Sequence, residues 1–442
     1  MIEPQPIAEK VCEMVGARAE AICRVARNAC GLTRYANSFI HQHHGEDTAS
    51  VSLEVAVEGR VSSSSTTRIE DDDLARLVDE TIEGARLSPL DPRWPGVAGP
   101  GESVSPGHTD RSTVDAGPDE RVAHVAQFVE AGPGLLAAGF VDTGLVEVAL
   151  ATTGGRVASG SSTRATLDGI HQTATSAGNA HQTSVRFSDL DGAAAGRRAA
   201  DLARRGENQI DVAPGRYEVV LSPECVATVA VFLGLYGFGG RSYLDGQSFV
   251  DIGSQQFDAA FQLVDDPEDP RSIGVGFDDE GTSKHRLVLV EGGVTRTVVH
   301  DRRTAKEAGA ESTGHALAGS GFGPLPHNLV VGRGDQSPEE LVAGVERGLF
   351  VSTFNYCRIL DPRTQVVTGL TRNGTFLIED GEITSPVTNL RFTQSFVEAL
   401  GPERVMAIGN DQRHADNEFG PGLVVAPSMR LAQWNFTGGA QG

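Results

Sequence analysis

The chain has 442 residues, of which 39% are hydrophobic, and its 59 acidic and 37 basic residues give a net charge of −22. A chain of this length is too long for one compact core, so we expect two domains. The acidic balance argues against nucleic-acid binding, because the protein's field repels phosphate and no run of Lys or Arg offsets it.

The N-terminal segment predicts helices that alternate with strands. Apolar residues at three- and four-residue spacing predict a helix over 7–26. Alternation over 51–57 predicts a strand, followed by a turn at 58–59 and a return strand over 61–67. A helix is expected over 69–87, because the four acids near its start oppose the helix dipole.

Residues 88–118 are rich in Pro, Gly and Ser and lack periodicity, so we expect an exposed or partly disordered loop there. The pattern then predicts a short helix over 122–131. Two strands, over 145–150 and 156–166, are expected to be joined by a Gly-Gly turn. A helix with acidic residues at its start is predicted over 189–205.

The N-terminal half contains a short internal sequence repeat, which we call the echo. Thr33-Arg34 is followed after five residues by Ile40-His41-Gln42, and Thr163-Arg164 is followed after five by Ile170-His171-Gln172. Each copy leads into a strand-like segment and then a helix with an acidic start. The echo predicts a duplicated strand-strand-helix unit within one N-terminal α+β domain, residues 1–210.

A second domain, residues 211–442, is expected to be mainly antiparallel β. Asn, Pro and Gly gather near 207–216, which is typical of a domain boundary. A compact apolar strand over 217–221 and an apolar helix over 223–234 follow. Short strands between Gly, Asp and Pro are predicted over 286–290, 295–300, 328–331, 374–378 and 423–425. Their spacing favours a barrel or sandwich, so the predicted fold class is α+β with two domains.

The expected location is the cytoplasm. The N-terminus lacks the basic and apolar regions of a signal peptide, and the five cysteines include no CxxC pair, as expected of free thiols in a reducing compartment. The longest uncharged stretch runs only from Cys225 to Gly240 and contains glycines. Since a membrane helix needs roughly 20 mostly apolar residues, we expect no membrane partner.

No catalytic constellation stands out from the residues alone. The sequence has no HExxH, HExxxH or GxSxG motif. His41 and His44 have the separation of two ligands on one helical face, but their polar surroundings favour a solvated turn. Cys225 lies in an apolar helical pattern and Cys357 in a strand-like one, where thiols behave as small hydrophobes.

Several ordered blocks in the second half resemble the TldD/PmbA family. Its pattern "FDDEG…VLIENGVL…D…TA…ESTGNA" is similar to blocks at 277–281, 287–293, 301, 304–305 and 311–316. Later blocks are similar to the segments 328–331, 334–335, 339–341, 348–349, 378–383 and 408–411. The resemblance covers nearly the whole chain, and ordered blocks at family spacing are more specific than one motif.

The resemblance implies where a zinc site would lie. TldD-type members carry HExxxH on the helix after the first strand of the C-terminal domain, together with a late cysteine. Here that helix is Pro223 to Gly237, and matching the preceding strand places Val231, Phe232 and Tyr236 at or near the motif's His, Glu and His. The segment 409–431 contains no cysteine, and Cys357 lies too early to replace it. We therefore expect no catalytic residue and no metal ligand in this chain.

The chain thus resembles the PmbA (TldE) type of subunit. The resemblance implies a non-catalytic, pseudoenzyme-like subunit of a hetero-oligomeric metallopeptidase, with a TldD-like partner that holds the zinc and with unfolded peptides as substrate. One alternative is an independent hydrolase with an unrecognised site, for instance His315 with Asp278 or Asp279. The other is a homo-oligomeric peptide-binding scaffold without a peptidase partner.

Overall fold

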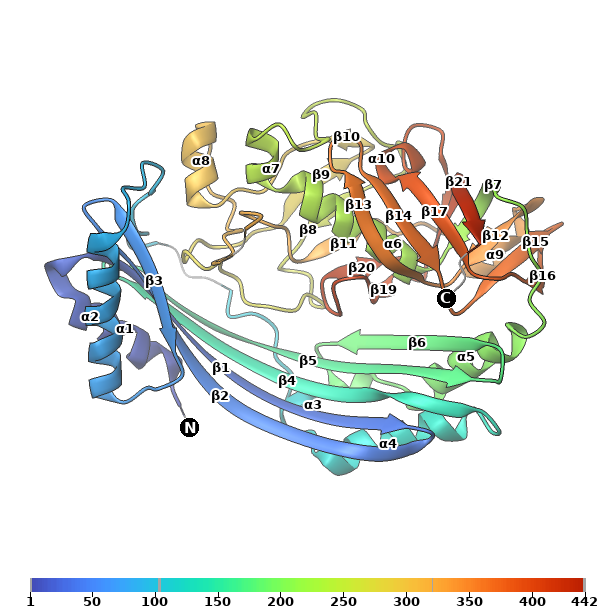
Figure 1. Ribbon diagram of the computed structural model, residues 1–442, viewed down its shortest axis with the longest axis horizontal. Helices are drawn as coiled ribbons and strands as arrows, with labels where there is room; N and C mark the ends of the chain where they lie inside the picture. Colours follow the sequence, from blue (N-terminus) through green and yellow to red (C-terminus); the bar gives the residue numbers. More distant parts are fainter. Residues whose placement is uncertain (1, 102–104, 320, 440–442) are drawn as a thin grey trace.

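The computed structural model describes residues 2–101, 105–319 and 321–439. Its N-terminal part is built on a six-stranded antiparallel sheet in the order β3-β2-β1-β4-β5-β6. The strands are β1 (Glu20–Ala36), β2 (Phe39–Val57), β3 (Arg60–Thr66), β4 (Leu136–Thr152), β5 (Val157–Gln172) and β6 (Ala177–Ser184). The long strands curve beneath the C-terminal part of the chain (Figure 1).

Two pairs of helices pack on this sheet. The pair α1 (Pro4–Val15) and α2 (Asp71–Leu87) shares an apolar core with β1 and β2 at one end of the sheet. The pair α4 (Pro118–Glu130) and α5 (Gly192–Arg205) covers β4, β5 and β6 toward the other end (Figure 1). Shorter helical elements are the 3-10 turns η1 (Gly16–Arg18) and η2 (Phe187–Asp189) and the helix α3 (Arg111–Val114).

The predicted duplication is present as a repeated arrangement, α1-β1-β2-β3-α2 followed by α4-β4-β5-β6-α5. Each unit contributes three strands, one more than expected. The sequence echo does not mark equivalent places, because Thr33 lies on the first strand of its unit and Thr163 on the second strand of the other. A few matched polar residues cannot set strand register, which depends on the apolar pattern of whole strands.

The predicted first helix is wrong beyond Val15. The chain leaves the helix at Gly16, whose φ of 56° suits glycine, and Ile22, Val25 and Ala26 lie on β1. β1 is an inner strand with buried residues on both faces at this end. Apolar residues on both faces remove the two-residue alternation, which is why this strand carried a helix-like spacing.

The other predicted N-terminal helices and strands are present, but β2 and β4 begin well before the predicted strands at 51 and 145. Glu58 and Gly59 both have positive φ, as a tight hairpin turn between β2 and β3 requires. Residues 102–104 of the expected loop lie outside the described residues. The described parts of that loop lie against the sheet, where the Trp94 indole donates a 2.6 Å hydrogen bond to Glu20 and the Ser161 amide donates one of 2.6 Å to the Pro106 carbonyl.

The C-terminal part contains two sheets, one of six strands and one of nine. The first has the order β10-β9-β8-β11-β20-β19, with strands β8 (Leu263–Asp265), β9 (Leu287–Glu291), β10 (Val294–Thr295), β11 (Leu329–Val331), β19 (Arg413–His414) and β20 (Val424–Ala426). The second has the order β13-β14-β17-β21-β7-β12-β15-β16, and β18 pairs with β21. Its strands are β7 (Gly215–Leu221), β12 (Arg347–Val351), β13 (Phe354–Asp361), β14 (Val366–Thr371), β15 (Thr375–Glu379), β16 (Glu382–Pro386), β17 (Leu390–Ser395), β18 (Val405–Ile408) and β21 (Met429–Gly439).

The main core lies between these two sheets and is filled by the helix α6 (Pro223–Leu233), which continues into a π-helical turn, η3 (Gly234–Phe238). Pairing is antiparallel except between β7 and β12 and between β11 and β20. Within the described residues each sheet ends on two edge strands, so the layers form a sandwich-like arrangement and not a closed barrel. The remaining helices are α7 (Gly240–Leu244), α8 (Arg302–Ala308), α9 (Pro338–Ala343) and α10 (Phe396–Ala399).

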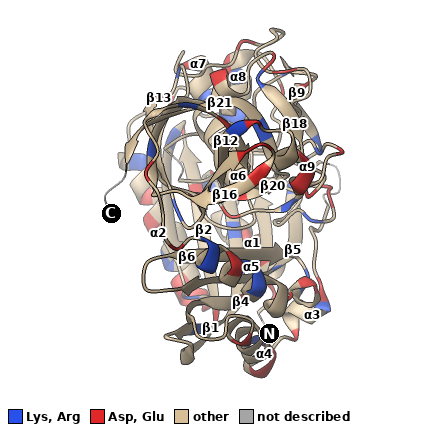
Figure 2. Cartoon of the chain, turned by 90° about the vertical axis from the view of Figure 1, so that its right-hand side faces the viewer, with Lys and Arg blue, Asp and Glu red and all other residues tan. Residues whose placement is uncertain are grey.

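The α+β class with an N-terminal α+β part and a mainly antiparallel C-terminal part is therefore confirmed. The strand predicted over 295–300 is present only at its start, because β10 (Val294–Thr295) ends at Thr295. Val299 forms an isolated parallel bridge with Gly239 instead. Residues 206–214 connect α5 to β7, and we propose the domain boundary in this segment. In the view of Figure 2, basic and acidic residues are interspersed over both parts. No helix of the described chain is long and apolar enough to cross a membrane.

Candidate functional site

The positions expected to replace a zinc motif lie on the central helix. Val231 and Phe232 are on the last turn of α6, and Tyr236 is on the π-helical turn that follows. α6 begins with Pro223 at its first position, where the missing N–H is not needed, and all of its residues are buried. A mostly apolar helix whose residues are all buried packs as a core element.

Aromatic rings occupy the space around these positions. Phe232 lies 5.6 Å from Tyr236, 5.8 Å from Phe396 and 5.5 Å from Phe419, measured between ring centroids. Tyr236 in turn meets Phe322 edge-on at 6.0 Å. Burial raises the pKa of the Tyr236 hydroxyl, which therefore stays neutral. Zinc needs imidazole, thiolate or carboxylate ligands, so this aromatic cluster does not fit the metal.

A polar cleft opens beside the first turns of the same helix. It has a volume of about 330 Å³ and lies between the N-terminal sheet and the C-terminal part. Helix α6 contributes Thr228 and Glu224, which lie one and two turns before Phe232 on the same face. The other lining residues, mostly carboxylates and amides, are Asp168, Ile170, Asn179, Thr353, Phe354, Asn355, Arg372, Asn373, Asp416, Asn417 and Glu418.

Glu224 is the buried charge of this cleft. Its side chain is 5% exposed and accepts a 2.7 Å hydrogen bond from Arg413 on β19 and one of 3.3 Å from Arg198 on α5. Burial alone would raise the pKa of this carboxyl, but the two guanidinium groups outweigh it and hold the pKa at about 2. Glu224 is thus an ionised link between the two parts of the chain, and a poor general base near neutral pH.

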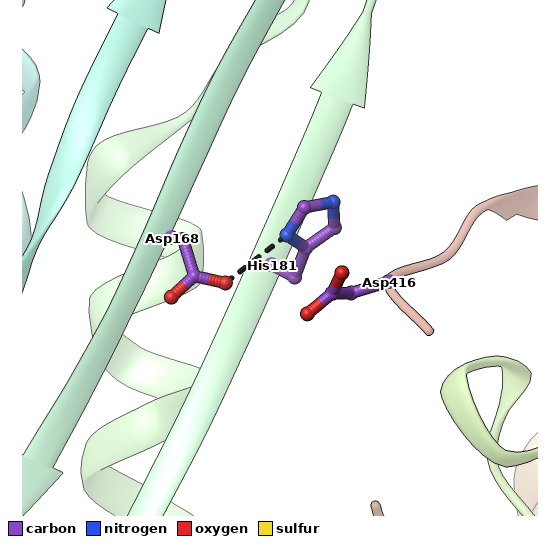
Figure 3. A group of neighbouring side chains, drawn as sticks. All are labelled: Asp168, His181 and Asp416. Atoms are coloured by element: carbon purple, nitrogen blue, oxygen red, sulfur yellow. Dashed lines mark hydrogen bonds and ion pairs between the residues drawn. The ribbon is translucent and has the colours of Figure 1, made fainter. Parts of the chain in front are cut away.

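A second charged group lies on the opposite wall of the cleft. Asp168 on β5 and His181 on β6 are direct cross-strand partners, and Asp416 approaches them from the segment between β19 and β20 (Figure 3). The His181 Nδ1 atom is 3.2 Å from Asp168 Oδ2, and its Nε2 is 2.8 Å from the Thr183 hydroxyl. One ligand atom from each of the three residues lies within 4.8 Å of the others. Among the described residues, this is the one group of His, Cys, Asp or Glu that could hold a metal ion.

The protonation of this group follows from its surroundings. Burial lowers the pKa of His181, but the hydrogen bond to Asp168 and the negative charge of Asp416 outweigh it and raise the pKa overall. Burial also raises the pKa of Asp416. Two carboxylates and one imidazole can therefore share a positive charge, either a proton on the ring or a cation among the three side chains.

The C-terminal half of the sequence decides to which protein family the chain belongs. A family model described as the PmbA/TldA metallopeptidase C-terminal domain matches residues 214–438, about half of the chain. The chain belongs to the PmbA/TldD family.

Similar proteins agree with this assignment. A metalloprotease of Methanothermobacter thermautotrophicus is 27% identical over 228 residues, 49% of this chain and 48% of that protein. The metalloprotease PmbA of Escherichia coli O157:H7 is 24% identical over 243 residues, 53% of this chain and 50% of the relative. The matches thus span about half the length of these relatives.

Solved structures resemble the fold along nearly the whole chain. TldE from Thermococcus kodakarensis superposes with a TM-score of 0.86 at 18% identity, covering 98% of this chain and 99% of that one. A putative modulator of a DNA gyrase from Thermotoga maritima superposes with a TM-score of 0.85 at 17% identity, with the same coverage. At these identities the likeness shows the fold alone.

The histidines and cysteines considered in the sequence analysis form neither a metal site nor a nucleophile in this PmbA/TldD chain. His41 and His44 lie within β2, not in a turn, and three residues apart on a strand they point to opposite faces. Cys225 and Cys357 are buried in the core, and burial raises the pKa of both thiols. Neither is a credible nucleophile, because the thiolate is the reactive form.

His315 does not pair with Asp278 or Asp279 in this PmbA/TldD chain. Its Nε2 is 3.2 Å from Asp265 Oδ1, and both side chains are almost fully buried. Asp278 instead accepts backbone hydrogen bonds from Glu280, Thr282 and Ala316, which fold the "FDDEG" segment into a turn. The arrangement is that of a buried structural pair.

The group formed by Asp168, His181 and Asp416 was missed by reasoning from the sequence. No short spacing joins these residues, because the first two meet through strand register and the third arrives from the other part of the chain. An available signal was the pair of polar residues Asp168 and His181 on either side of a possible turn. Such a signal becomes useful only when the register is known.

Proposed function

We propose that this chain is a non-catalytic subunit of a PmbA/TldD-type metallopeptidase that acts on unfolded peptides, and that a TldD-like subunit supplies the zinc. The observation that carries the proposal is that Val231, Phe232 and Tyr236, at the positions where we expect the zinc motif, carry no group that binds zinc. Phe232 packs instead against the rings of Tyr236 and Phe419. A catalytic zinc site needs about three protein ligands and a group that activates water. The family's metallopeptidase chemistry then has to come from another chain.

The cleft beside α6 suits a peptide-binding role. β6 is an edge strand of the N-terminal sheet, and β13 is an edge strand of the nine-stranded sheet. Residues of both strands, Asn179 and Asn355 among them, line the cleft. An unfolded peptide can add to such an edge through backbone hydrogen bonds, a mode that reads the backbone more than the side chains. The likeness to a solved TldE over nearly the whole chain also supports this subunit type.

The test is reconstitution with a TldD-like subunit of the same source. Hydrolysis of an unfolded fluorogenic peptide is measured for this chain alone, for the partner alone and for the mixture, after size-exclusion chromatography of each. We expect a mixed complex that cleaves the peptide and no cleavage by this chain alone. Chelator-sensitive cleavage by the isolated chain would support the independent hydrolase. A stable homo-oligomer that does not bind the partner would support the alternative of a peptide-binding scaffold. Either of these two results would overturn the proposal.

A further inference from the structure

We propose that Asp168, His181 and Asp416 bind a divalent transition-metal ion such as Zn²⁺ or Mn²⁺ in the cleft, where it ties the N-terminal sheet to the C-terminal part. The site is separate from the zinc-motif positions on α6, which the aromatic cluster fills. It also departs from the expectation that this chain binds no metal. The inference concerns binding and cohesion of the two parts, and assigns no peptidase activity to this chain.

The three side chains are held in place by independent parts of the fold. Asp168 and His181 share one face of the sheet, because they are paired residues on β5 and β6. Asp416 follows β19, which lies against β6, and the next residue, Asn417, donates a 2.8 Å hydrogen bond to the Gly420 carbonyl that orders the segment. Strand pairing and the ordered segment after β19 therefore bring the three side chains together before any ion binds (Figure 3). Such preorganisation is what a metal site requires.

The surroundings of His181 suit either a proton or a cation on Nδ1. The ring is 4% exposed, and its Nε2 lies 2.8 Å from the hydroxyl of Thr183, which is itself 3.3 Å from the hydroxyl of Thr166. Nε2–H can donate to Thr183, and Thr183 can donate onward to Thr166. In the other tautomer Nδ1–H donates to Asp168 and the Thr183 hydroxyl donates to Nε2, whereas in this one Nδ1 turns its lone pair toward Asp168 Oδ2. A lone pair and carboxylate oxygens repel each other unless a cation lies between them.

The distance agrees with shared coordination. Nδ1 and Asp168 Oδ2 are 3.2 Å apart. Charge-assisted N–H···O⁻ hydrogen bonds are shorter, at about 2.7–2.9 Å. Two ligand atoms at roughly 2.0–2.2 Å from one metal ion are about 3.0–3.4 Å apart at the usual coordination angles. Mixed imidazole and carboxylate ligands suit Zn²⁺ or Mn²⁺ better than Mg²⁺, which prefers oxygen ligands and water.

Access and charge also favour an ion here. Asp168 and Asp416 line the cleft of about 330 Å³, so a hydrated cation can enter and keep water at its open positions. Another carboxylate of the cleft, Glu224, is already neutralised by two arginines. The two aspartates therefore leave a net negative charge around the ring unless a metal ion or a proton is added.

The test is isothermal titration calorimetry of the isolated, chelator-treated full chain with ZnCl₂, MnCl₂ and MgCl₂. We expect one Zn²⁺ or Mn²⁺ ion per chain, at least tenfold weaker Mg²⁺ binding, and a rise in thermal unfolding temperature with the bound ion. Asp416→Asn should weaken the binding at least tenfold. The matched control is Glu418→Gln, which removes a carboxylate from the same cleft wall and should leave the binding unchanged.

A variant that failed to fold would be recognised in the metal-free state. Apo Asp416→Asn should unfold in a cooperative transition, as the apo wild type does, which would show that the variant is folded. Equal Zn²⁺ affinity in wild type and Asp416→Asn would overturn the site. So would absence of binding together with an NMR titration that shows a protonated His181 ring. These assays need no partner and no peptide, so their failure is distinguishable from failure of the reconstitution.

Discussion

Replacing Glu224 by Gln tests how the two parts of the chain are joined at the cleft. The carboxylate is 5% exposed and neutralises Arg413 and Arg198, which come from β19 and α5. The amide keeps the size of the side chain but removes its charge. Two guanidinium groups then face a neutral partner, and the Nη1 atom of Arg413 already lacks a hydrogen-bond partner.

The magnitude follows from the pKa of Glu224. The folded value is about 2 against an ordinary 4.5. The difference, at about 1.36 kcal/mol per unit, corresponds to roughly 3 kcal/mol of stability at pH 7. Removing one partner of a buried ion pair typically costs about 3–5 kcal/mol, which agrees. Because the folded pKa is depressed, the contribution is complete above pH 4.5 and is lost as pH falls toward 2.

The assay is urea unfolding of wild type and Glu224→Gln at pH 7, 5, 4 and 3. The difference in free energy of unfolding should be roughly 3 kcal/mol at pH 7 and should shrink to about 1.5 kcal/mol at pH 3. Asp201→Asn on α5 serves as control, since its ion pair with Arg205 is exposed and is worth little. A pH-independent difference, or none at all, would refute the reasoning.

Three further predictions concern other parts of the fold. Burial and the charge of Asp278 raise the pKa of Glu280 to about 8, so wild-type stability should fall as pH rises from 4.5 to 8. Urea unfolding should then find Glu280→Gln more stable by roughly 2–4 kcal/mol at pH 8 and no more stable at pH 4. Phe232→Ala should lower the free energy of unfolding by about 3–5 kcal/mol, since it empties the centre of the aromatic cluster. With the thiol reagent DTNB, Cys30 alone should react in the native protein and all five thiols after unfolding, because the other four are buried.

Local patterns predicted those elements whose signals were complete within a few residues. The acidic start and apolar stripe of α2 and the tight turn at Glu58 and Gly59 required no long-range information. The burial of α6 was also readable, because nearly all of its residues after Glu224 are apolar. β1 was mistaken for helix since both of its faces are buried near Val25, and burial on the second face is decided by distant segments.

The candidate site likewise has one part that the sequence indicates and one part that only the tertiary structure reveals. The expectation that the zinc motif is absent rests on residue types alone, because Val231 and Phe232 carry no ligand atom, and it stays a prediction. The group of Asp168, His181 and Asp416 was not, since it depends on the register of β5 with β6 and on the packing of β19 against β6. A spacing rule finds ligands on one helix or loop, but cannot find ligands that tertiary structure brings together.

The most direct test of a non-catalytic role places an inactivating change in the partner alone. A complex of this chain with a TldD-like subunit is prepared with the Glu of the partner's HExxxH motif intact or replaced by Gln. Hydrolysis of the unfolded peptide is then compared at equal complex concentration. If the partner supplies all the catalysis, the intact complex cleaves and the substituted one does not. Cleavage that persists in the substituted complex would show that this chain is itself catalytic.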